Sequence, residues 1–476
     1  IKKYQDIILN PKDTITFDHA MDLRIREERT LIGSDACLIK DENNNIHHVN
    51  FIEKILAVIL SKISNFIPEA GIWMNTQRPE WNDANNALVG NGVSMVTLYY
   101  LRRFLVFFEK ILNTSTVSEV KISQELIDCY KNIRKILEEN VILLASKISD
   151  NDRKNIVDQI GEAASSYRWH VYDHGFWGKK RTISIEGIQR FNKISLQFID
   201  HAIESNQRPD GLYHAYNLAS FEGETVKISH LTVMLEGQVA ALSAGILDAK
   251  QVVQVLNALK QSPLYDQDRN SYILYPNKKL PGFLEKNTFD ESEIKDCQLI
   301  IELIDKGDKS IIEKDILGYY HFHKDFKNIN DLKDGLTKLI SHNYVHYNKT
   351  ELDKIYSIYE KIFNHKAFTG RSGTFYAYEG LGSIYWHMVS KLLLAVVENI
   401  FKAYHEKADK KHCDALIKHY YDLYEGLGIH KSPQAYGAFP TDAYSHTPSK
   451  KGAQQPGMTG QVKEDIICRW GELGVH

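Results

Sequence analysis

The chain has 476 residues, with 58 Lys and Arg against 61 Asp and Glu, and a formal net charge of −3 at pH 7. This near balance, without a basic tract, argues against a nucleic-acid partner, and no apolar run approaches the roughly 20 residues that cross a bilayer. Five widely spaced cysteines without a CxxC pair indicate neither a disulfide framework nor a cysteine zinc site.

We therefore expect a soluble, cytoplasmic protein without a membrane partner. Because the sequence begins at Ile1 rather than Met, we expect a trimmed N-terminus, so a periplasmic or secreted location stays open. Composition gives no indication of the oligomeric state.

Residues 1–48 differ from the rest of the chain. The short alternating stretches Thr14–Phe17 and Ala36–Lys40 are typical of strands, and the polar run Asp41–Asn45 follows them. We expect an extended or β linker segment that forms the end of a missing or partial N-terminal domain.

From residue 49 onward the pattern is helical, because apolar residues recur at spacings of three and four. The predicted helical windows are 50–66, 91–113, 122–147, 151–166, 187–205, 231–246, 249–261, 292–305, 331–341, 351–363, 380–403 and 409–424. Twelve helices in sequence predict six helical hairpins.

Helical hairpins stack as an open solenoid or close into a toroid. The chain has no fixed repeat period, and long polar and aromatic connections are interspersed with short ones. We therefore predict a mainly α fold, an (α/α)6 toroid over residues 49–427, with function on the rim that carries the long loops. Residues 428–476 are predicted to form a long loop and a C-terminal segment packed on the barrel, with a strand or short helix at Val462–Trp470.

The segment Arg78–Gly90 joins two predicted helices and contains Glu80, Trp81 and Asp83. Cleavage of a glycosidic bond needs a protonated carboxyl group at the leaving oxygen, because an alkoxide leaves poorly. Burial against the indole and the nearby second carboxylate would raise the pKa of Asp83 and keep its proton in place near neutral pH. Asp83 is therefore the candidate general acid; the alternative is an N-cap of the following helix.

The string Trp81-Asn82-Asp83 resembles the motif that carries the general acid in the (α/α)6-barrel glycoside phosphorylases acting on cellobiose and related β-glucosides, within the six-hairpin glycosidase superfamily. The turn Gly370–Thr374 resembles their phosphate-binding turn, and the stretch 318–323 stands where they carry a phosphate-site His. The resemblance implies a proton donor at Asp83. It also implies an inorganic phosphate site made of His323, Arg371, Ser372 and Thr374.

The residue types around Arg371 also suit an anion, because hydroxyls, exposed backbone N–H groups and a helix start all attract negative charge. An ordinary helix start with glycine turns is the alternative. If water attacks instead of phosphate, a second carboxylate must act as base. Glu379 is the first candidate, Glu472 the second and Glu236 the third, although a carboxylate at a helix start is also stabilised by the helix dipole.

Two other classes stay open: a polysaccharide lyase, because helical toroids also host elimination by Tyr or His, and a glycan-binding protein without turnover. Aromatic side chains present flat faces to sugar rings. An oligosaccharide or polysaccharide is predicted to contact Arg78, Trp81, Asn82, Trp169, His170, Trp177, Tyr213, His214 and Tyr378. Tyr385 and His387 lie in an apolar helix and are predicted to belong to the core.

No metal or organic cofactor is expected, and inorganic phosphate is the possible co-substrate. His321 and His323 have no third ligand at a fixed spacing, and Asp266–Asn270 begins like a calcium loop without completing one.

Overall fold

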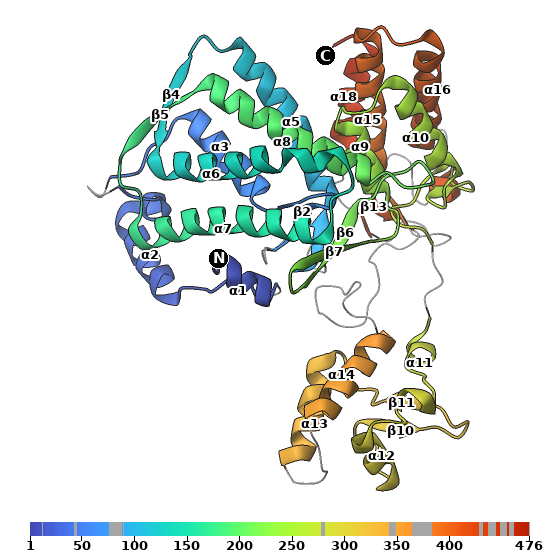
Figure 1. Cartoon of the computed structure of the whole chain (residues 1–476). Coiled ribbons are helices and arrows are strands. Elements are labelled where there is room, and N and C mark those ends of the chain that lie inside the picture. Colours follow the sequence, from blue (N-terminus) through green and yellow to red (C-terminus); the bar gives the residue numbers. More distant parts are fainter. Residues whose placement is uncertain are drawn as a thin grey trace. The chain divides into compact units, whose positions relative to one another are not determined.

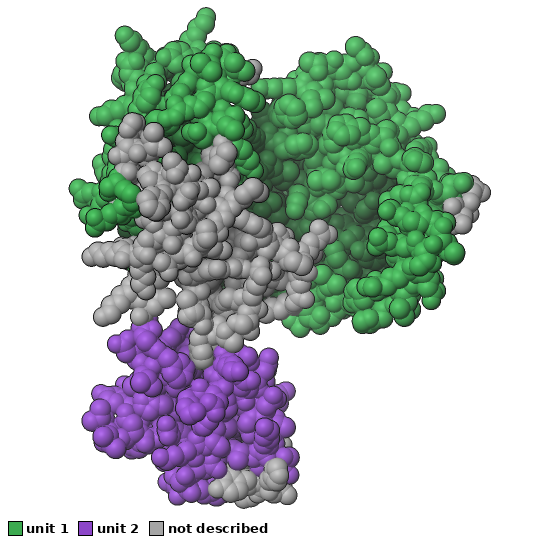
Figure 2. Space-filling view, turned by 180° about the vertical axis from the view of Figure 1, so that it is seen from behind, with its two compact units in different colours: residues 1–77, 89–277, 382–476 green, residues 78–88, 278–381 purple. Residues whose placement is uncertain are grey.

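The computed structural model describes residues 1–11, 13–41, 45–75, 88, 90–277, 281–341, 349–363, 383–427, 432–436, 444–447, 455–456 and 461–475. Helices dominate this part of the chain, so the predicted mainly α class is confirmed (Figure 1). Contacts divide the chain into two compact units (Figure 2). Unit 1 comprises residues 1–77, 89–277 and 382–476, and unit 2 comprises residues 78–88 and 278–381. No helix among the described residues is long and apolar enough to cross a membrane.

The N-terminal segment is largely helical where an extended or β segment was predicted. Helix α1 spans Tyr4–Leu9, α2 spans His19–Ile32, and a 3-10 helix, η1, spans Gly33–Cys37. At the start of α2 the Asp18 carboxylate accepts the backbone N–H of Met21 (2.9 Å), and α2 has no buried residue. Capping and local helix propensity therefore account for α2, and neither leaves an apolar period in the sequence.

Unit 1 contains long helices at most of the predicted windows. They are α3 (Phe51–Ile63), α5 (Met95–Thr114), α6 (Gln124–Asn140), α7 (Asp150–His174), α8 (Ile185–Ser205), α9 (Leu235–Ser243), α10 (Ala249–Gln261), α15 (Trp386–His405), α16 (Lys410–Leu427) and α18 (Gln461–Glu472). The neighbours α6 and α7 pack on each other, as do α15 and α16, and α15 also contacts α9 and α18 (Figure 1). Helical hairpins are therefore present, as the apolar spacing predicted.

A five-stranded antiparallel sheet in unit 1 was not predicted. Its strands, in spatial order, are β1 (Phe66–Ile67), β2 (Gly71–Trp73), β3 (Gly92–Ser94), β6 (Tyr216–Glu222) and β7 (Thr225–His230). The first three have only two or three residues, too few for an alternating pattern to appear in the sequence. Ser94 pairs with both Ile72 and Tyr216, so β3 joins the segment before it to residues far along the chain.

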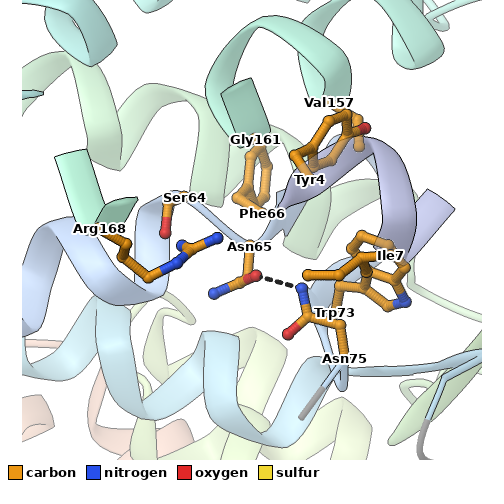
Figure 3. A pocket seen from close by; sticks show the side chains of 10 residues that line it. All are labelled: Tyr4, Ile7, Ser64, Asn65, Phe66, Trp73, Asn75, Val157, Gly161 and Arg168. Carbon is orange, nitrogen blue, oxygen red and sulfur yellow. Dashed lines mark hydrogen bonds between the residues drawn. The ribbon is translucent and has the colours of Figure 1, made fainter. Parts of the chain in front are cut away.

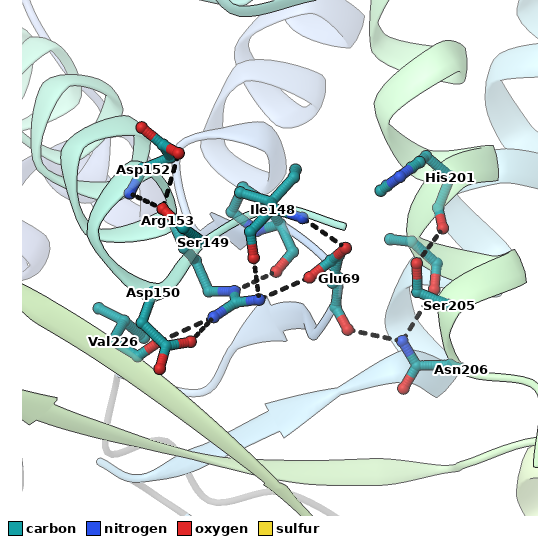
Figure 4. A network of polar contacts seen from close by, with 12 residues as sticks. Glu69, Ile148, Ser149, Asp150, Asp152, Arg153, His201, Ser205, Asn206 and Val226 are labelled. Carbon is teal, nitrogen blue, oxygen red and sulfur yellow. Dashed lines mark hydrogen bonds and ion pairs between the residues drawn. The ribbon is translucent and has the colours of Figure 1, made fainter. Parts of the chain in front are cut away.

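A buried ion pair fastens α7 to this sheet (Figure 4). Arg153 of α7 is 3% exposed and its Nη2 lies 2.5 Å from Oε2 of Glu69, which is 7% exposed. The same guanidinium donates to the carbonyls of Pro68 and Val226, both at 3.0 Å. The Glu69 carbonyl accepts the Asn206 side-chain N–H (2.7 Å). One arginine therefore connects α7, the β1–β2 turn and β7, and Glu69 extends the connection to the end of α8.

The smaller elements of unit 1 complete it. They are η2 (Val141–Ala145), the paired strands β4 (Glu119–Ser123) and β5 (Lys180–Ser184), the paired strands β8 (Tyr265–Asp266) and β9 (Ser271–Tyr272), the sheet β12 (Ile384–Tyr385), β13 (Tyr444–Thr447) and β14 (Gln455–Pro456), and α17 (Pro433–Tyr436).

Unit 2 has a core of its own. Its described elements are α11 (Phe283–Lys286), η3 (Glu291–Glu293), α12 (Gln298–Asp305), β10 (Ile312–Lys314), β11 (Tyr320–Phe322), α13 (Ile329–Ser341) and α14 (Lys349–Phe363). Leu303, Phe322, Leu336 and Tyr359 are buried together in one cluster. The predicted windows over α12, α13 and α14 are helical, but these helices do not share the core of unit 1, so the single barrel predicted over residues 49–427 is corrected here. Apolar spacing predicts that a helix face is buried, not which core buries it.

Candidate active site

The described residues that flank the segment carrying Asp83 are hydrogen-bonded beside β2 and β3, two inner strands of the five-stranded sheet. The backbone N–H of Met74 donates to the Gly92 carbonyl (2.9 Å), and that of Gly90 donates to the Met74 carbonyl (2.8 Å). The Trp73 indole N–H also donates to the Gly90 carbonyl (2.8 Å). Gly90 has φ of 98°, a conformation that favours glycine. The predicted site residues Arg78, Trp81, Asn82 and Asp83 lie outside the described residues.

Ser383, the first described residue after the predicted phosphate turn Gly370–Thr374, is linked by backbone hydrogen bonds to the start of α9. The Ser383 carbonyl accepts the backbone N–H of Leu274 (2.9 Å), and the Leu274 carbonyl accepts that of Leu235 (3.0 Å). Leu235 is the first residue of α9 and directly precedes Glu236. Glu236, the third base candidate, therefore lies on a helix whose first residue is linked through Leu274 to Ser383. The predicted site residues Arg371, Ser372, Thr374, Tyr378 and Glu379 lie outside the described residues.

One tyrosine binds the Glu236 carboxylate, and the charge of this carboxylate acts on two more. The Tyr216 hydroxyl donates to Glu236 Oε2 (3.0 Å). Burial raises the pKa of Tyr100 and of Tyr385, and the negative charge of Glu236 raises the pKa of both further. We call Glu236, Tyr100, Tyr216 and Tyr385 the Glu236 group. A carboxylate and phenol hydroxyls together accept and donate hydrogen bonds, as binding of sugar hydroxyls requires.

A polar connection leads from the Glu236 group toward α18. The Tyr385 hydroxyl lies 3.3 Å from His387 Nδ1, and His387 Nε2 lies 3.7 Å from Glu464 Oε1. Burial, with smaller contributions from two lysines, lowers the pKa of His387 to about 4, and burial raises the pKa of Glu464. The imidazole is therefore neutral near pH 7. Tyr385 is 6% exposed, in agreement with the predicted core position, yet its hydroxyl takes part in this connection.

Aromatic side chains at the end of α7 form separate contacts: His170 meets Trp177, and Trp169 meets Tyr172. The rings of His170 and Trp177 meet edge to face at 4.5 Å, and the Trp177 backbone N–H donates to Glu125 Oε1 (2.8 Å). Trp177 is 43% exposed, so part of its ring is accessible to a ligand. Lys3 Nζ lies 5.0 Å from the Trp169 ring. These residues come from one helix and the loop that follows it, and their role in sugar binding stays a prediction.

Tyr213 and His214 lie just before β6 and are more enclosed than substrate contacts need. Tyr213 is 4% exposed, and its backbone N–H and carbonyl bind the Gln238 side chain at 2.9 and 2.7 Å. The His214 ring stacks on His230 at 4.0 Å. Burial lowers the pKa of His214 to about 4, with smaller contributions from the charges of His230 and Arg208. Tyr213 therefore offers no open face for a sugar ring in this structure.

Glu472 and His323 differ in how far their side chains are already engaged. Glu472 ends α18, where its carboxylate accepts the Tyr420 hydroxyl (2.7 Å) and lies 3.2 Å from Arg469 Nη1. These bonds connect α16 and α18, which is a structural role.

His323 follows β11 in unit 2, and its side chain is 34% exposed, with Nδ1 3.9 Å from Asp325. The neighbouring His321 is held by the Asn287 carbonyl (2.5 Å) and Asp315 (3.1 Å), which leaves His323 as the more accessible imidazole.

Comparison with known proteins relates unit 2 to a described domain. Residues 280–366 match the model of the GH149 phosphorylase insertion domain 2. The match confirms, for this part of the chain, the resemblance to glycoside phosphorylases. Among solved structures the chain is similar to cellobiose 2-epimerase from Bacillus thermoamylovorans, at 10% identity over 89% of this chain and 100% of that chain, with a TM-score of 0.17. No curated protein matches the chain.

The matched residues coincide with the long interruption of unit 1 by unit 2. Unit 1 stops at Asn277 and resumes at Gly382, and the match to the GH149 insertion domain lies inside this interval. His323 belongs to unit 2, whereas Glu236 belongs to unit 1. The tyrosines of the Glu236 group carried no sequence signal, because they come from α5, β6 and β12, which are separated by long stretches of chain.

Proposed function

We propose that the protein is a carbohydrate-active enzyme, a glycoside phosphorylase on a helical toroid, that cleaves a glycosidic bond with inversion. The match of residues 280–366 to an insertion domain of GH149 phosphorylases carries the proposal. The Trp81-Asn82-Asp83 motif and the turn Gly370–Thr374 support it, because the reaction needs a proton donor and an anion site. The substrate is an oligosaccharide or polysaccharide, and inorganic phosphate is the co-substrate.

In the proposed reaction, Asp83 gives its proton to the glycosidic oxygen as the bond from that oxygen to the anomeric carbon breaks. A phosphate oxygen forms a bond to the same carbon from the opposite face, so the products are a sugar 1-phosphate of inverted configuration and a shortened saccharide. Phosphate is held by His323, Arg371, Ser372 and Thr374. Their charge and hydrogen bonds place the nucleophile in line with the bond that breaks.

The Glu236 group is the described part of unit 1 that best suits a sugar contact. Its carboxylate is oriented by the Tyr216 hydroxyl, which donates to Oε2 (3.0 Å). A carboxylate fixed in this way accepts hydrogen bonds from two sugar hydroxyls at once. We propose that it binds the sugar whose anomeric carbon is attacked.

Phosphate dependence tests the proposal directly. Purified protein is expected to release sugar 1-phosphate from a panel of oligosaccharides only when phosphate is present, as measured by phosphorus NMR. Arg371→Met is expected to raise the KM for phosphate at least about tenfold, because a charge-assisted contact contributes about 1.5–3 kcal/mol. Arg190→Met, on the exposed face of α8, is the matched control. Sugar release that does not change when phosphate is removed would exclude phosphorolysis.

An inverting hydrolase is the second candidate, with Asp83 as acid and Glu379 as base. Glu236, the third base candidate, lies on the first turn of α9. A base is needed to activate water but not phosphate. If the enzyme is a hydrolase, either Glu379→Gln or Glu236→Gln is expected to reduce kcat by about 10²–10⁴-fold.

If the enzyme is a phosphorylase, Glu379→Gln keeps most of its activity, and Glu236→Gln raises the KM for the saccharide more than it lowers kcat. The KM and kcat of both variants, measured with and without phosphate, separate the two mechanisms. An unsaturated uronate product would instead support the lyase class.

A further inference from the structure

Three consecutive residues at the start of α9 contact one short segment, residues 213–216, which leads into β6. Glu236 is partly exposed, whereas Gly237 and Gln238 are buried. The Glu236 carboxylate meets residue 216, Gly237 packs on residue 215, and the Gln238 side chain binds residue 213. A partly exposed carboxylate and two buried contacts with the same segment therefore lie on one helical turn.

The Gln238 side chain binds the backbone of Tyr213 as a neighbouring strand would. Its Oε1 accepts the Tyr213 backbone N–H (2.9 Å), and its Nε2 donates to the carbonyls of Tyr213 (2.7 Å) and Met234 (3.1 Å). These bonds need a side chain that both donates and accepts. Gln238 is 0% exposed, so water cannot replace the bonds if the amide is lost. Gln238 therefore fixes Tyr213 relative to the first turn of α9.

Gly237 allows this segment to approach α9 closely. A Cβ at this position would lie 2.8 Å from the Cβ of Ala215 and 3.0 Å from its Cα and backbone N, so the backbone would have to shift. The Ala215 carbonyl also accepts the backbone N–H groups of Met95 (2.9 Å) and Val96 (3.3 Å). The segment is therefore held both by α9 and by the start of α5.

Tyr216 connects this segment to the Glu236 carboxylate. Its backbone pairs with Ser94 of β3, its side chain is 2% exposed, and its hydroxyl donates to Glu236 Oε2 (3.0 Å). A buried ring has little freedom to turn, because close packing surrounds it. The position of the hydroxyl therefore depends on the backbone of residues 213–216, which Gln238 holds.

The small pocket between α1 and α7 in unit 1 does not offer another contact for a sugar ring. It is lined on its apolar side by Tyr4, Phe66 and Trp73 and has room for about one water molecule (Figure 3). Gly161 of α7 packs so closely on the Tyr4 ring that a Cβ there would overlap it. A sugar ring does not fit in this pocket.

We propose that Gln238 is a positioning residue for saccharide binding and that it acts on Glu236 through Tyr216. By holding the Tyr213 backbone, Gln238 keeps the Tyr216 hydroxyl where it orients the carboxylate toward sugar hydroxyls. A carboxylate that is already oriented loses less freedom on binding, so the saccharide binds more tightly. The inference rests on the proposed sugar contact of Glu236, and it holds whether phosphate or water attacks the sugar.

Saccharide affinity measured by calorimetry without phosphate tests the proposal. The parent protein carries Asp83→Asn, which removes the predicted proton donor and prevents cleavage during the titration. The probes are β-linked gluco-oligosaccharides of two to four units, and the one that the parent binds most tightly is used throughout. Gln238→Leu is expected to raise the Kd about tenfold, because the donor of a charge-assisted hydrogen bond is released.

The matched control is Gln251→Leu. Gln251 also lies in the first turn of a helix, and its side chain accepts the Asp248 backbone N–H (2.9 Å) in the capping box of α10. Its loss is expected to lower the midpoint of thermal unfolding and to leave the Kd unchanged. A rise of the Kd in this control equal to that in Gln238→Leu would overturn the proposal, because loss of stability would then explain both.

A double-mutant cycle shows whether Gln238 acts through Tyr216. In protein that carries Tyr216→Phe, Gln238→Leu is expected to change the Kd less than about twofold, because the hydroxyl that it positions is already absent. A tenfold rise in both backgrounds would overturn the proposal. Glu236→Gln tests the proposed sugar contact separately. If it leaves the Kd unchanged, that contact fails; if it weakens binding while Gln238→Leu does not, only the positioning role fails.

Two further variants keep the test decisive if Gln238→Leu does not fold. Gln238→Glu keeps the shape of the side chain, but a carboxylate cannot donate to the Tyr213 and Met234 carbonyls. Its Kd is expected to exceed that of the parent at neutral pH and to approach it as the pH falls, because a protonated carboxyl regains one donor. Gly237→Ala displaces residue 215 and is expected to raise the Kd as well. An unchanged Kd in both variants would contradict the proposal.

Discussion

Asp83→Asn is expected to lower kcat by about 10²–10⁴-fold for natural saccharides, because an amide cannot protonate the leaving oxygen. The loss is expected to shrink strongly for a glycosyl fluoride or nitrophenyl glycoside, whose leaving group needs little protonation. Steady-state kinetics on both kinds of substrate measure the difference. Dependence on the leaving group separates a proton donor from a residue that only positions the substrate.

The control for this prediction is Asp128→Asn, which removes an exposed carboxylate on α6. Its kcat is expected to match that of the wild type. The alternative role of Asp83, an N-cap, gives a different result: the midpoint of thermal unfolding falls while kcat per folded molecule is retained. Full activity in Asp83→Asn with natural saccharides would exclude it as the general acid.

The sequence predicted helices well because burial of one face leaves a period of three to four residues. Windows such as 187–205 and 249–261 coincide with α8 and α10. The same rule could not separate α13 and α14 from unit 1, since a helix in an insertion domain buries its face just as a barrel helix does. Only contacts within the fold distinguish the two cores.

The contacts of the candidate site also differ in how far the sequence could predict them. The contact of His170 with Trp177 could be predicted, because both residues lie close to the end of one helix. The Glu236 group could not be predicted from the sequence. Its members come together only after β3 has paired with β6 and after Ser383 has bonded to the chain near α9. Contacts between residues so far apart in sequence leave no spacing pattern to detect. Asp83 and Arg371 stay predictions from motifs.

The largest effect on stability is expected for Arg153→Met, which leaves Glu69 without its cation. Breaking a buried ion pair from one side costs about 3–5 kcal/mol, because the remaining charge stays buried and unpaired. Arg153 also supplies N–H donors to the Pro68 and Val226 carbonyls, which lose these partners. Denaturant unfolding at neutral pH measures the change, with Lys227→Met as the control, since Lys227 and Glu222 are paired on the surface.

A double variant, Arg153→Met with Glu69→Gln, is expected to recover part of the loss, because it removes the unpaired charge. The amide oxygen of the new side chain can still accept the Ile148 backbone N–H, which now donates to Glu69 Oε1 (2.9 Å). Recovery identifies charge burial as the main cost; no recovery assigns this cost to the lost carbonyl partners.

Glu69 has φ of 61° in the turn that leads into β2, and β2 in turn holds one end of the Asp83 segment. Loss of this ion pair is therefore expected to reduce activity even at temperatures where the protein is still folded, because the segment that carries the acid loses its support.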